Sequence, residues 1–178
     1  MENSKFSIYL SGMQLFSNSQ KAITLQNSKR LGEFKDGKVI YSNFEALYLI
    51  EIGKADIIFN NKKQTKENII RIFSKKDKEF PIKYIVFREL RKKSYIVKAG
   101  LKFGGEFRVY SNPKNLKDFS ASNKHAKYIC YPIKSQKIEI KDLIAKIRIS
   151  HSTGKKLLLA VVDSENDVLF YEIDWIRL

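Results

Sequence analysis

The feature that most constrains this chain is the stretch 154–173, because it predicts a β-hairpin with a buried first arm. Residues 157–162 form a near-continuous apolar run of strand length, which is typical of a strand covered on both faces. A short acidic turn, 163–167, separates this run from residues 168–173, which are rich in β-branched and aromatic side chains. We therefore expect a central strand followed by a last strand whose edge is open to a partner.

Two adjacent lysines, Lys155 and Lys156, stand at the entrance of this predicted central strand. Just upstream, residues 142–152 carry apolar side chains at helical spacing, and Gly154 is suited to a left-handed helix stop. Lys155 is therefore expected where a helix ends and a buried strand begins. Such a rigid mount can aim a cation at a fixed point.

The charge of the chain points to a polyanionic partner. Among 178 residues, 34 Lys and Arg stand against 19 Asp and Glu, which gives a net charge of +15. With 43% apolar and 12% aromatic residues, the chain is a folded globular protein with one domain or two small ones. Nucleic acid is the first candidate partner, and a lysine-rich surface without specific function is the alternative. The basic residues do not line one face of an amphipathic helix, which disfavours a membrane surface.

The chain is expected to be intracellular, in the cytoplasm. No run reaches the roughly 18–20 apolar residues of a transmembrane helix, and the N-terminus lacks the apolar core of a signal peptide. The single Cys130 lies in an apolar run and is predicted to pack as a small hydrophobic residue.

We predict an α+β fold with two domains, a small mixed domain over residues 1–80 and a second domain over residues 81–178. The boundary follows a charged segment and precedes Pro81, which suits the first turn of a helix. In the first domain, a turn at 35–38 leads into a strand at 39–41. The other expected strands there are 6–10, 23–25 and 56–59, and the expected helices are 44–52, capped by Ser42 or Asn43 and ended by Gly53, and 65–75.

The second domain is expected to present a tyrosine and a histidine at the two ends of one polar loop. The predicted helix 82–92 is followed by strands at 95–97, 107–110 and 126–133. Tyr110 ends one of these strands, and His125 precedes the next. Tyr, His and Lys at strand edges of a strongly basic protein indicate metal-free phosphodiester chemistry. The alternative is that Tyr110 is an aromatic residue at the edge of the core and His125 an ordinary loop residue.

Three blocks of this second domain, residues 95–110, 124–128 and 154–163, closely resemble the archaeal tRNA-splicing (tRNA-intron) endonucleases and occur in that family's order. A weaker resemblance at residues 44–50 extends over the first domain. The resemblance implies a catalytic domain built on a mixed β-sheet flanked by helices. It also implies excision of introns from precursor tRNA at bulge-helix-bulge sites, leaving 2′,3′-cyclic phosphate and 5′-hydroxyl ends, without metal or cofactor.

The resemblance further implies a Tyr, His, Lys catalytic triad, which falls on Tyr110, His125 and Lys155. Lys155 matches the family pattern because it stands five residues before Ala160, and Lys156 is the fallback. Family analogy places an arginine that grips a bulged base seven residues before the lysine. In this chain that residue is Arg148.

Further expectations from the resemblance concern RNA contacts and assembly. The loop between the tyrosine and the histidine is longer than in compact homotetrameric members and resembles the extra RNA-contacting loop of crenarchaeal catalytic subunits. This likeness favours a catalytic subunit of an α2β2 heterotetramer with a structural partner subunit over an α4 tetramer. The acidic turn resembles the family loop that enters a basic pocket of another subunit, although it also fits an ordinary solvated turn. The expected RNA contacts are Lys102, Lys114, Lys117 and Lys124, and the expected subunit contacts are Asp163, Glu165 and Asp167.

Two other functions stay open on the sequence. Glu139 and Lys141 form an acidic-x-lysine pattern that, with an upstream Asp, occurs in metal-dependent nucleases. The second alternative is a structural subunit that holds RNA and cuts nothing, although all three triad positions are present.

Overall fold

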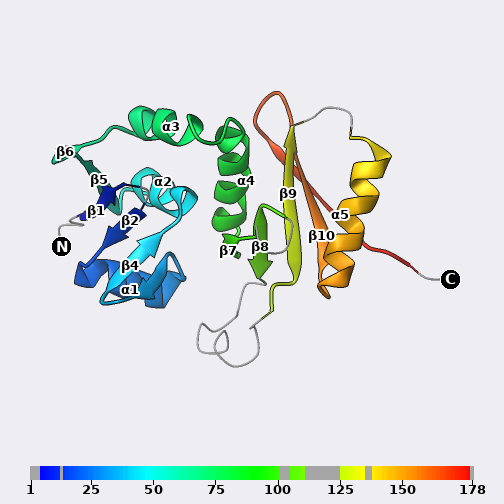
Figure 1. Ribbon diagram of the computed structural model, residues 1–178, viewed down its shortest axis with the longest axis horizontal. Coiled ribbons are helices and arrows are strands. Elements are labelled where there is room, and N and C mark those ends of the chain that lie inside the picture. The colour runs from blue at the N-terminus through cyan, green and yellow to red at the C-terminus, as the bar shows by residue number, and fades with distance from the viewer. Residues whose placement is uncertain (1–4, 13, 101–104, 111–124, 135–137, 177–178) are drawn as a thin grey trace. The chain divides into compact units, whose positions relative to one another are not determined.

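The computed structural model describes residues 5–12, 14–100, 105–110, 125–134 and 138–176 (Figure 1). The chain divides into two compact units, Met1–Pro81 and Ile82–Leu178. Helices accompany a sheet of six strands and a sheet of five, so the predicted α+β class is confirmed. No helix within these described ranges is long and apolar enough to cross a membrane.

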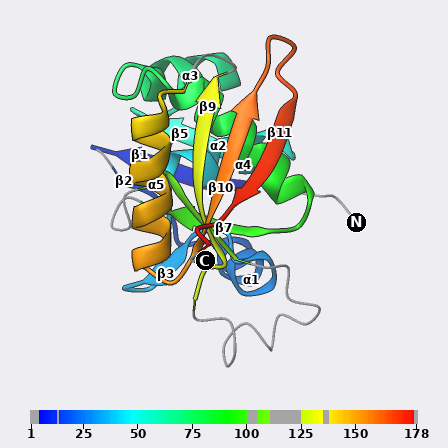
Figure 2. The same ribbon diagram turned by 90° about the vertical axis from the view of Figure 1, so that its right-hand side faces the viewer.

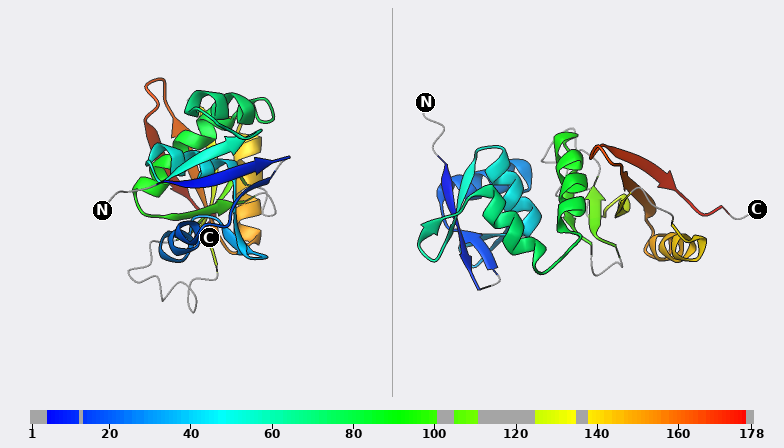
Figure 3. Two further views of the ribbon diagram at one scale, coloured as in Figure 1. Left: turned by 90° about the vertical axis from the view of Figure 1, so that its left-hand side faces the viewer. Right: turned by 90° about the horizontal axis from the view of Figure 1, so that it is seen from above.

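The N-terminal unit is a mixed sheet with helices on one face (Figure 3). Its strand order is β3-β4-β2-β1-β5-β6, in which β1 runs parallel to β5 and the other neighbours are antiparallel. The strands are β1 (Phe6–Ser11), β2 (Gln14–Ser17), β3 (Glu33–Lys35), β4 (Lys38–Tyr41), β5 (Ala55–Phe59) and β6 (Lys62–Lys63). The helices are α1 (Gln20–Lys29), α2 (Asn43–Glu51) and α3 (Lys66–Ser74).

The strand predicted at residues 23–25 is wrong, because these residues lie inside α1. The Ser19 hydroxyl accepts the backbone N–H of Ala22 at 3.1 Å and so caps the helix. Farther along, the Thr24 hydroxyl donates to the Gln20 carbonyl at 3.0 Å. Local capping therefore overrides the β-preference of two β-branched residues.

Helix α2 begins and ends as predicted. The Ser42 hydroxyl accepts the N–H of Glu45 at 3.2 Å, and the Glu45 carboxylate accepts the N–H of Ser42 at 3.0 Å. Glu45 is only 4% exposed and also accepts the Gly32 N–H at 2.9 Å. Burial, and to a smaller extent the charge of this carboxylate, raises the pKa of Tyr41. At the other end, Gly53 has a φ of 68°, which favours glycine.

The C-terminal unit is a five-stranded sheet between two helices, in the order β11-β10-β9-β8-β7 (Figures 1 and 2). Strand β9 runs parallel to β10, which the crossover helix α5 makes possible, and the other neighbours are antiparallel. The strands are β7 (Ile96–Ala99), β8 (Phe107–Tyr110), β9 (Tyr128–Lys134), β10 (Lys156–Val162) and β11 (Val168–Ile173). The helices are α4 (Phe80–Lys92) and α5 (Ile140–Ser152), which lie on opposite faces of the sheet (Figure 2).

Strand β10 is buried on both faces, as its continuous apolar run predicted. On one face, Leu157 and Leu159 join a buried cluster against which Leu143 and Ile147 of α5 pack. On the other face of β10, Leu158 and Ala160 are buried. On that face of the sheet, Phe87 of α4 packs against Phe107 of β8, with ring centroids 5.8 Å apart. In contrast, β11 is the edge strand and leaves large apolar side chains exposed.

The close approach of β8 and β9 requires glycine at position 105. A Cβ built on Gly105 would lie 2.2 Å from Ile129 Cγ2. Because Ile129 is fully buried, its side chain has little room to move away. We expect Gly105→Ala to lower the free energy of unfolding by about 1–3 kcal/mol, because the surrounding core must shift. Urea denaturation followed by circular dichroism measures this. A variant as stable as the parent would contradict the tight packing.

Candidate active site

Three neighbouring strands of the C-terminal sheet place the predicted catalytic residues at one edge of the sheet, the one formed by the ends of the strands. Tyr110 is the last residue of β8, His125 comes shortly before β9, and Lys155 immediately precedes β10. Because β8 runs antiparallel to β9, and β9 parallel to β10, the end of β8 and the starts of the other two strands share this edge.

Backbone hydrogen bonds hold this edge together. The Lys127 N–H donates to the Val109 carbonyl at 2.9 Å, and the Lys156 N–H donates to the Lys127 carbonyl at 3.1 Å. The Tyr110 ring packs with Ala126, the residue that follows His125, and is 7% exposed. The three segments that carry the predicted triad are thus joined directly, and His125 is exposed to solvent.

Lys155 lies, as predicted, where helix α5 ends and the central strand β10 begins. Its backbone N–H donates to the Ser150 carbonyl at 2.9 Å at the end of α5, and Gly154 takes a φ of 65°. Its ammonium donates to the Thr153 carbonyl at 2.6 Å. The cation is therefore held by the turn that joins the crossover helix to the central strand.

Strand register separates the two adjacent lysines. Val109 pairs with Tyr128, and Tyr128 pairs with Lys156, so these three side chains share one face of the sheet. Tyr110 follows Val109 and Lys155 precedes Lys156. Because side chains alternate along extended chain, we infer that Tyr110 and Lys155 lie on the opposite face from Lys156.

Lys156 belongs to a group of side chains that the sequence analysis missed, which we call the Glu172 cluster: Lys127, Tyr128, Lys156, Glu172 and Asp174. The Tyr128 hydroxyl donates to Glu172 at 2.7 Å, and the Lys156 ammonium forms an ion pair with the same carboxylate. Lys156 also lies 3.7 Å from Asp174, and Lys127 lies 4.0 Å from Glu172. A carboxylate inside an otherwise apolar last strand was the available signal in the sequence.

These contacts lower the pKa of the acid in the cluster and raise the pKa of the lysine paired with it. The hydrogen bonds from Lys156 and Tyr128 lower the pKa of Glu172. The Glu172 carboxylate in turn raises the pKa of Lys156, while burial is the main cause of the raised pKa of Tyr128. At neutral pH the acid and the lysine are therefore both charged and tied to each other.

The predicted RNA contacts are placed only in part. Lys102, Lys114, Lys117 and Lys124 lie outside the described residues. Arg148 is exposed on α5 and lines a pocket of about 300 Å³ together with Trp175. Trp175 is 45% exposed. A guanidinium and an accessible aromatic ring therefore line the same pocket.

The acidic turn divides its carboxylates between two tasks. Asp163 accepts the N–H groups of Glu165 and Asp167, each at 2.9 Å, and so shapes the turn itself. Glu165 and Asp167 are exposed and available to other molecules.

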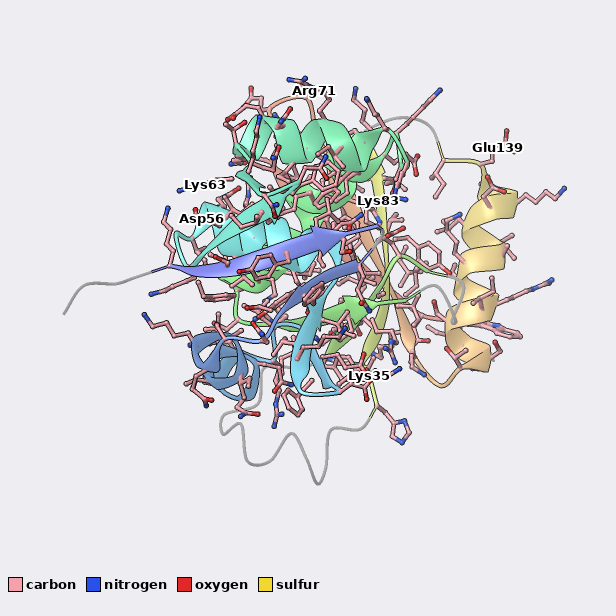
Figure 4. All side chains as sticks on the ribbon, turned by 60° about the vertical axis from the view of Figure 1, so that its left-hand side comes forward. Lys35, Asp56, Lys63, Arg71, Lys83 and Glu139 are labelled. Carbon is pink, nitrogen blue, oxygen red and sulfur yellow. The ribbon has the colours of Figure 1, made fainter. Side chains whose placement is uncertain are left out.

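The residues of the other sequence-based alternatives lie apart from this edge. Glu139 and Lys141 are exposed at the start of α5 (Figure 4 labels Glu139). Within the described ranges, no group of three or more His, Cys, Asp or Glu residues is arranged to hold a metal ion. Cys130 is fully buried, and burial raises the pKa of its thiol, as expected of a packing residue.

Comparison with known proteins places the chain among RNA-processing enzymes. The model of the tRNA intron endonuclease catalytic C-terminal domain matches residues 80–170. A tRNA-splicing endonuclease of Pyrococcus abyssi is 38% identical over 171 residues, which cover 95% of each chain. One from Thermococcus onnurineus is 36% identical over 94% of this chain and 95% of its own. One from Methanothermobacter thermautotrophicus is 32% identical over 86% of each chain. With a catalytic-domain match and relatives of this similarity along nearly its whole length, the chain belongs to the archaeal tRNA-splicing (tRNA-intron) endonuclease family.

Proposed function

We propose that this protein is an endoribonuclease that excises introns from precursor tRNA by metal-independent transesterification, with Tyr110, His125 and Lys155 as its catalytic residues. The observation that carries the proposal is the shared edge of β8, β9 and β10, where these three residues stand on hydrogen-bonded segments. Cleavage at bulge-helix-bulge sites leaves a 2′,3′-cyclic phosphate and a 5′-hydroxyl.

The chemistry requires proton transfer and charge stabilisation, which these side chains supply. A ribose 2′-hydroxyl already lies beside the scissile phosphate, so the enzyme must deprotonate it, align it and protonate the departing 5′-oxygen. Tyr110 removes the proton from the 2′-hydroxyl.

The other two residues act on the phosphate and the leaving group. An imidazole can act as a general acid, and His125 delivers the proton to the departing 5′-oxygen. The Lys155 ammonium stabilises the extra negative charge on the pentacoordinate phosphorane. Arg148 holds a bulged base by stacking its guanidinium on it, and the lysines at 102, 114, 117 and 124 contact the RNA backbone.

The direct test is cleavage of an intron-containing precursor tRNA in excess EDTA, by the purified chain alone and with a homologous partner subunit. We expect 2′,3′-cyclic phosphate and 5′-hydroxyl ends in EDTA. Loss of cleavage in EDTA, restored by Mg²⁺ and lost again in Glu139→Gln, would favour the metal-dependent nuclease. RNA binding without cleavage under every condition would favour the structural subunit.

We also propose that the protein works as a tetramer, α2β2 in preference to α4, assembled through the β11 edge and the acidic turn. Leu169 and Tyr171 on β11 are 54% and 50% exposed, and they lie on one face of the strand that ends the sheet, whose outer side has no neighbouring strand among the described residues. The exposed carboxylates of Glu165 and Asp167 suit a basic pocket of another subunit, while Asp163 holds the turn in shape.

Replacing Leu169 by lysine is expected to weaken the dimer formed through β11 by about tenfold or more, because burying a leucine contributes about 1.5–3 kcal/mol. Analytical ultracentrifugation over a range of concentrations measures the dissociation constant. Phe34→Lys is the matched control, because Phe34 is 51% exposed on β3 of the other unit. Equal association of parent and Leu169→Lys protein would contradict assembly through this edge.

A further inference from the structure

We propose that Glu172 is a positioning residue of the cleavage reaction: by holding Lys156 on the far face of the sheet, it leaves Lys155 as the lysine that meets the scissile phosphate. This inference rests on the proposed function. It adds a residue from the last strand, far in the sequence from the tyrosine and the histidine, to the device that aligns the phosphate.

The first step of the argument is that the two lysines are adjacent and chemically identical. A phosphate at this edge of the sheet would attract both ammonium groups, and a flexible four-carbon stem lets either one reach it. If the phosphate bound either lysine, it would occupy two alternative positions, and only one of them would place the phosphorus correctly. Because in-line attack depends on close alignment, phosphate bound in the other position would lower the cleavage rate while the RNA stayed bound.

The second step is that acidic side chains of the C-terminal strand and the segment after it restrain Lys156, whereas the Lys155 ammonium donates to the Thr153 carbonyl of its own turn. Glu172 pairs with Leu158 across β10 and β11, and Leu158 lies on the same face of β10 as Lys156. One carboxylate oxygen takes the Lys156 ammonium and the other takes the Tyr128 hydroxyl at 2.7 Å. Asp174 lies 3.7 Å from the same ammonium. Two acids from the last strand and the segment after it thus restrain a lysine from the central strand.

The third step concerns charge. Within the Glu172 cluster, the charges of Lys127 and Lys156 are balanced by Glu172 and Asp174. Removing the Glu172 charge frees a cation that RNA can bind, so binding and catalysis should change in opposite directions. A carboxylate that only stabilised the fold would not produce this split.

The experiment measures single-turnover cleavage of a precursor tRNA and, separately, binding of the same RNA with a 2′-deoxy nucleotide at the cleavage site. For Glu172→Gln we expect the cleavage rate to fall about tenfold. RNA binding is expected to stay equal or become tighter, with a salt dependence steeper by about one phosphate contact. Glu33→Gln is the control, because it removes the same charge from an exposed strand residue of the other unit.

A double-variant comparison decides whether Glu172 acts through Lys156. In the Lys156→Gln background, the further change Glu172→Gln is expected to have little effect on the cleavage rate, because the lysine next to Lys155 that Glu172 restrains is already gone. Glu172→Asp, which keeps the charge, is expected to restore part of the rate. An unchanged tenfold loss in the Lys156→Gln background would overturn the proposal, as would a loss of rate matched by a loss of RNA binding.

The outcomes also separate this inference from the proposed function. If Lys156→Gln alone abolished cleavage while Lys155→Ala did not, Lys156 would be the catalytic lysine and the assignment of the triad would be wrong. If Lys155→Ala abolished cleavage and Glu172→Gln left the rate unchanged, the triad would stand and only the positioning role would fail. Melting temperatures of every variant identify losses that come from unfolding.

Discussion

Replacing Lys155 by alanine is expected to lower the single-turnover cleavage rate by about 10²- to 10³-fold, the usual cost of removing one group that stabilises an oxyanion. The ammonium is partly exposed at the start of β10, and the backbone N–H that ties this turn to Ser150 remains in the variant. The melting temperature should therefore stay close to that of the parent. Binding of the 2′-deoxy substrate should weaken much less than cleavage.

The matched comparison is Lys156→Ala, which removes the same group from the neighbouring position. We expect this variant to retain most of the cleavage rate, because Lys156 is paired with Glu172 on the other face of the sheet. Rapid-quench measurement of both variants at saturating enzyme gives the two rates. Equal rates for parent and Lys155→Ala protein would remove Lys155 from the mechanism.

Replacing Tyr110 by phenylalanine is expected to lower the cleavage rate by about 10²- to 10⁴-fold, the range for loss of a general acid or base. The change removes one oxygen and keeps the ring that packs with Ile96 and Ala126. The fold should therefore be preserved, and the loss should appear in the rate of the chemical step. The measurement is single-turnover cleavage across a range of pH.

A second tyrosine provides the control for this prediction. Tyr131 is 8% exposed on β9, and its hydroxyl has no hydrogen-bond partner among the described residues. Tyr131→Phe should leave cleavage unchanged and should not lower the free energy of unfolding, because an unsatisfied buried hydroxyl is removed. A similar loss of rate in both phenylalanine variants would indicate a general effect of packing and would contradict a specific role for the Tyr110 hydroxyl.

Local signals in the sequence were sufficient for many of the elements. The C-terminal hairpin, the capped helix α2 and the glycine stop before Lys155 follow from patterns a few residues long, and the structure confirms them. The error at residues 23–25 arose where two local signals competed and a serine cap prevailed over β-branched residues. Strand β2 was not predicted at all, because its pairing with β1 and β4 is what stabilises it.

The Glu172 cluster shows what local reading could not supply. Glu172 is separated from Tyr128 by 44 positions, and only the pairing of β9, β10 and β11 brings the two side chains together. The acidic turn gives a smaller example: its carboxylates look equivalent in the sequence, but Asp163 is used to close the turn and Glu165 is not.

The amino-acid sequence by itself determined the chemical groups of the candidate site and most of the elements that carry them, because capping, periodicity and the family motifs are local. Only the tertiary structure decided which groups become neighbours. Parallel pairing of β9 with β10 sets Lys155 and His125 at the edge where Tyr110 ends, and the register assigns Lys156 to Glu172. The physical reason is that strand pairing joins distant segments, so the face and the partner of a side chain depend on register, which no short stretch of sequence specifies.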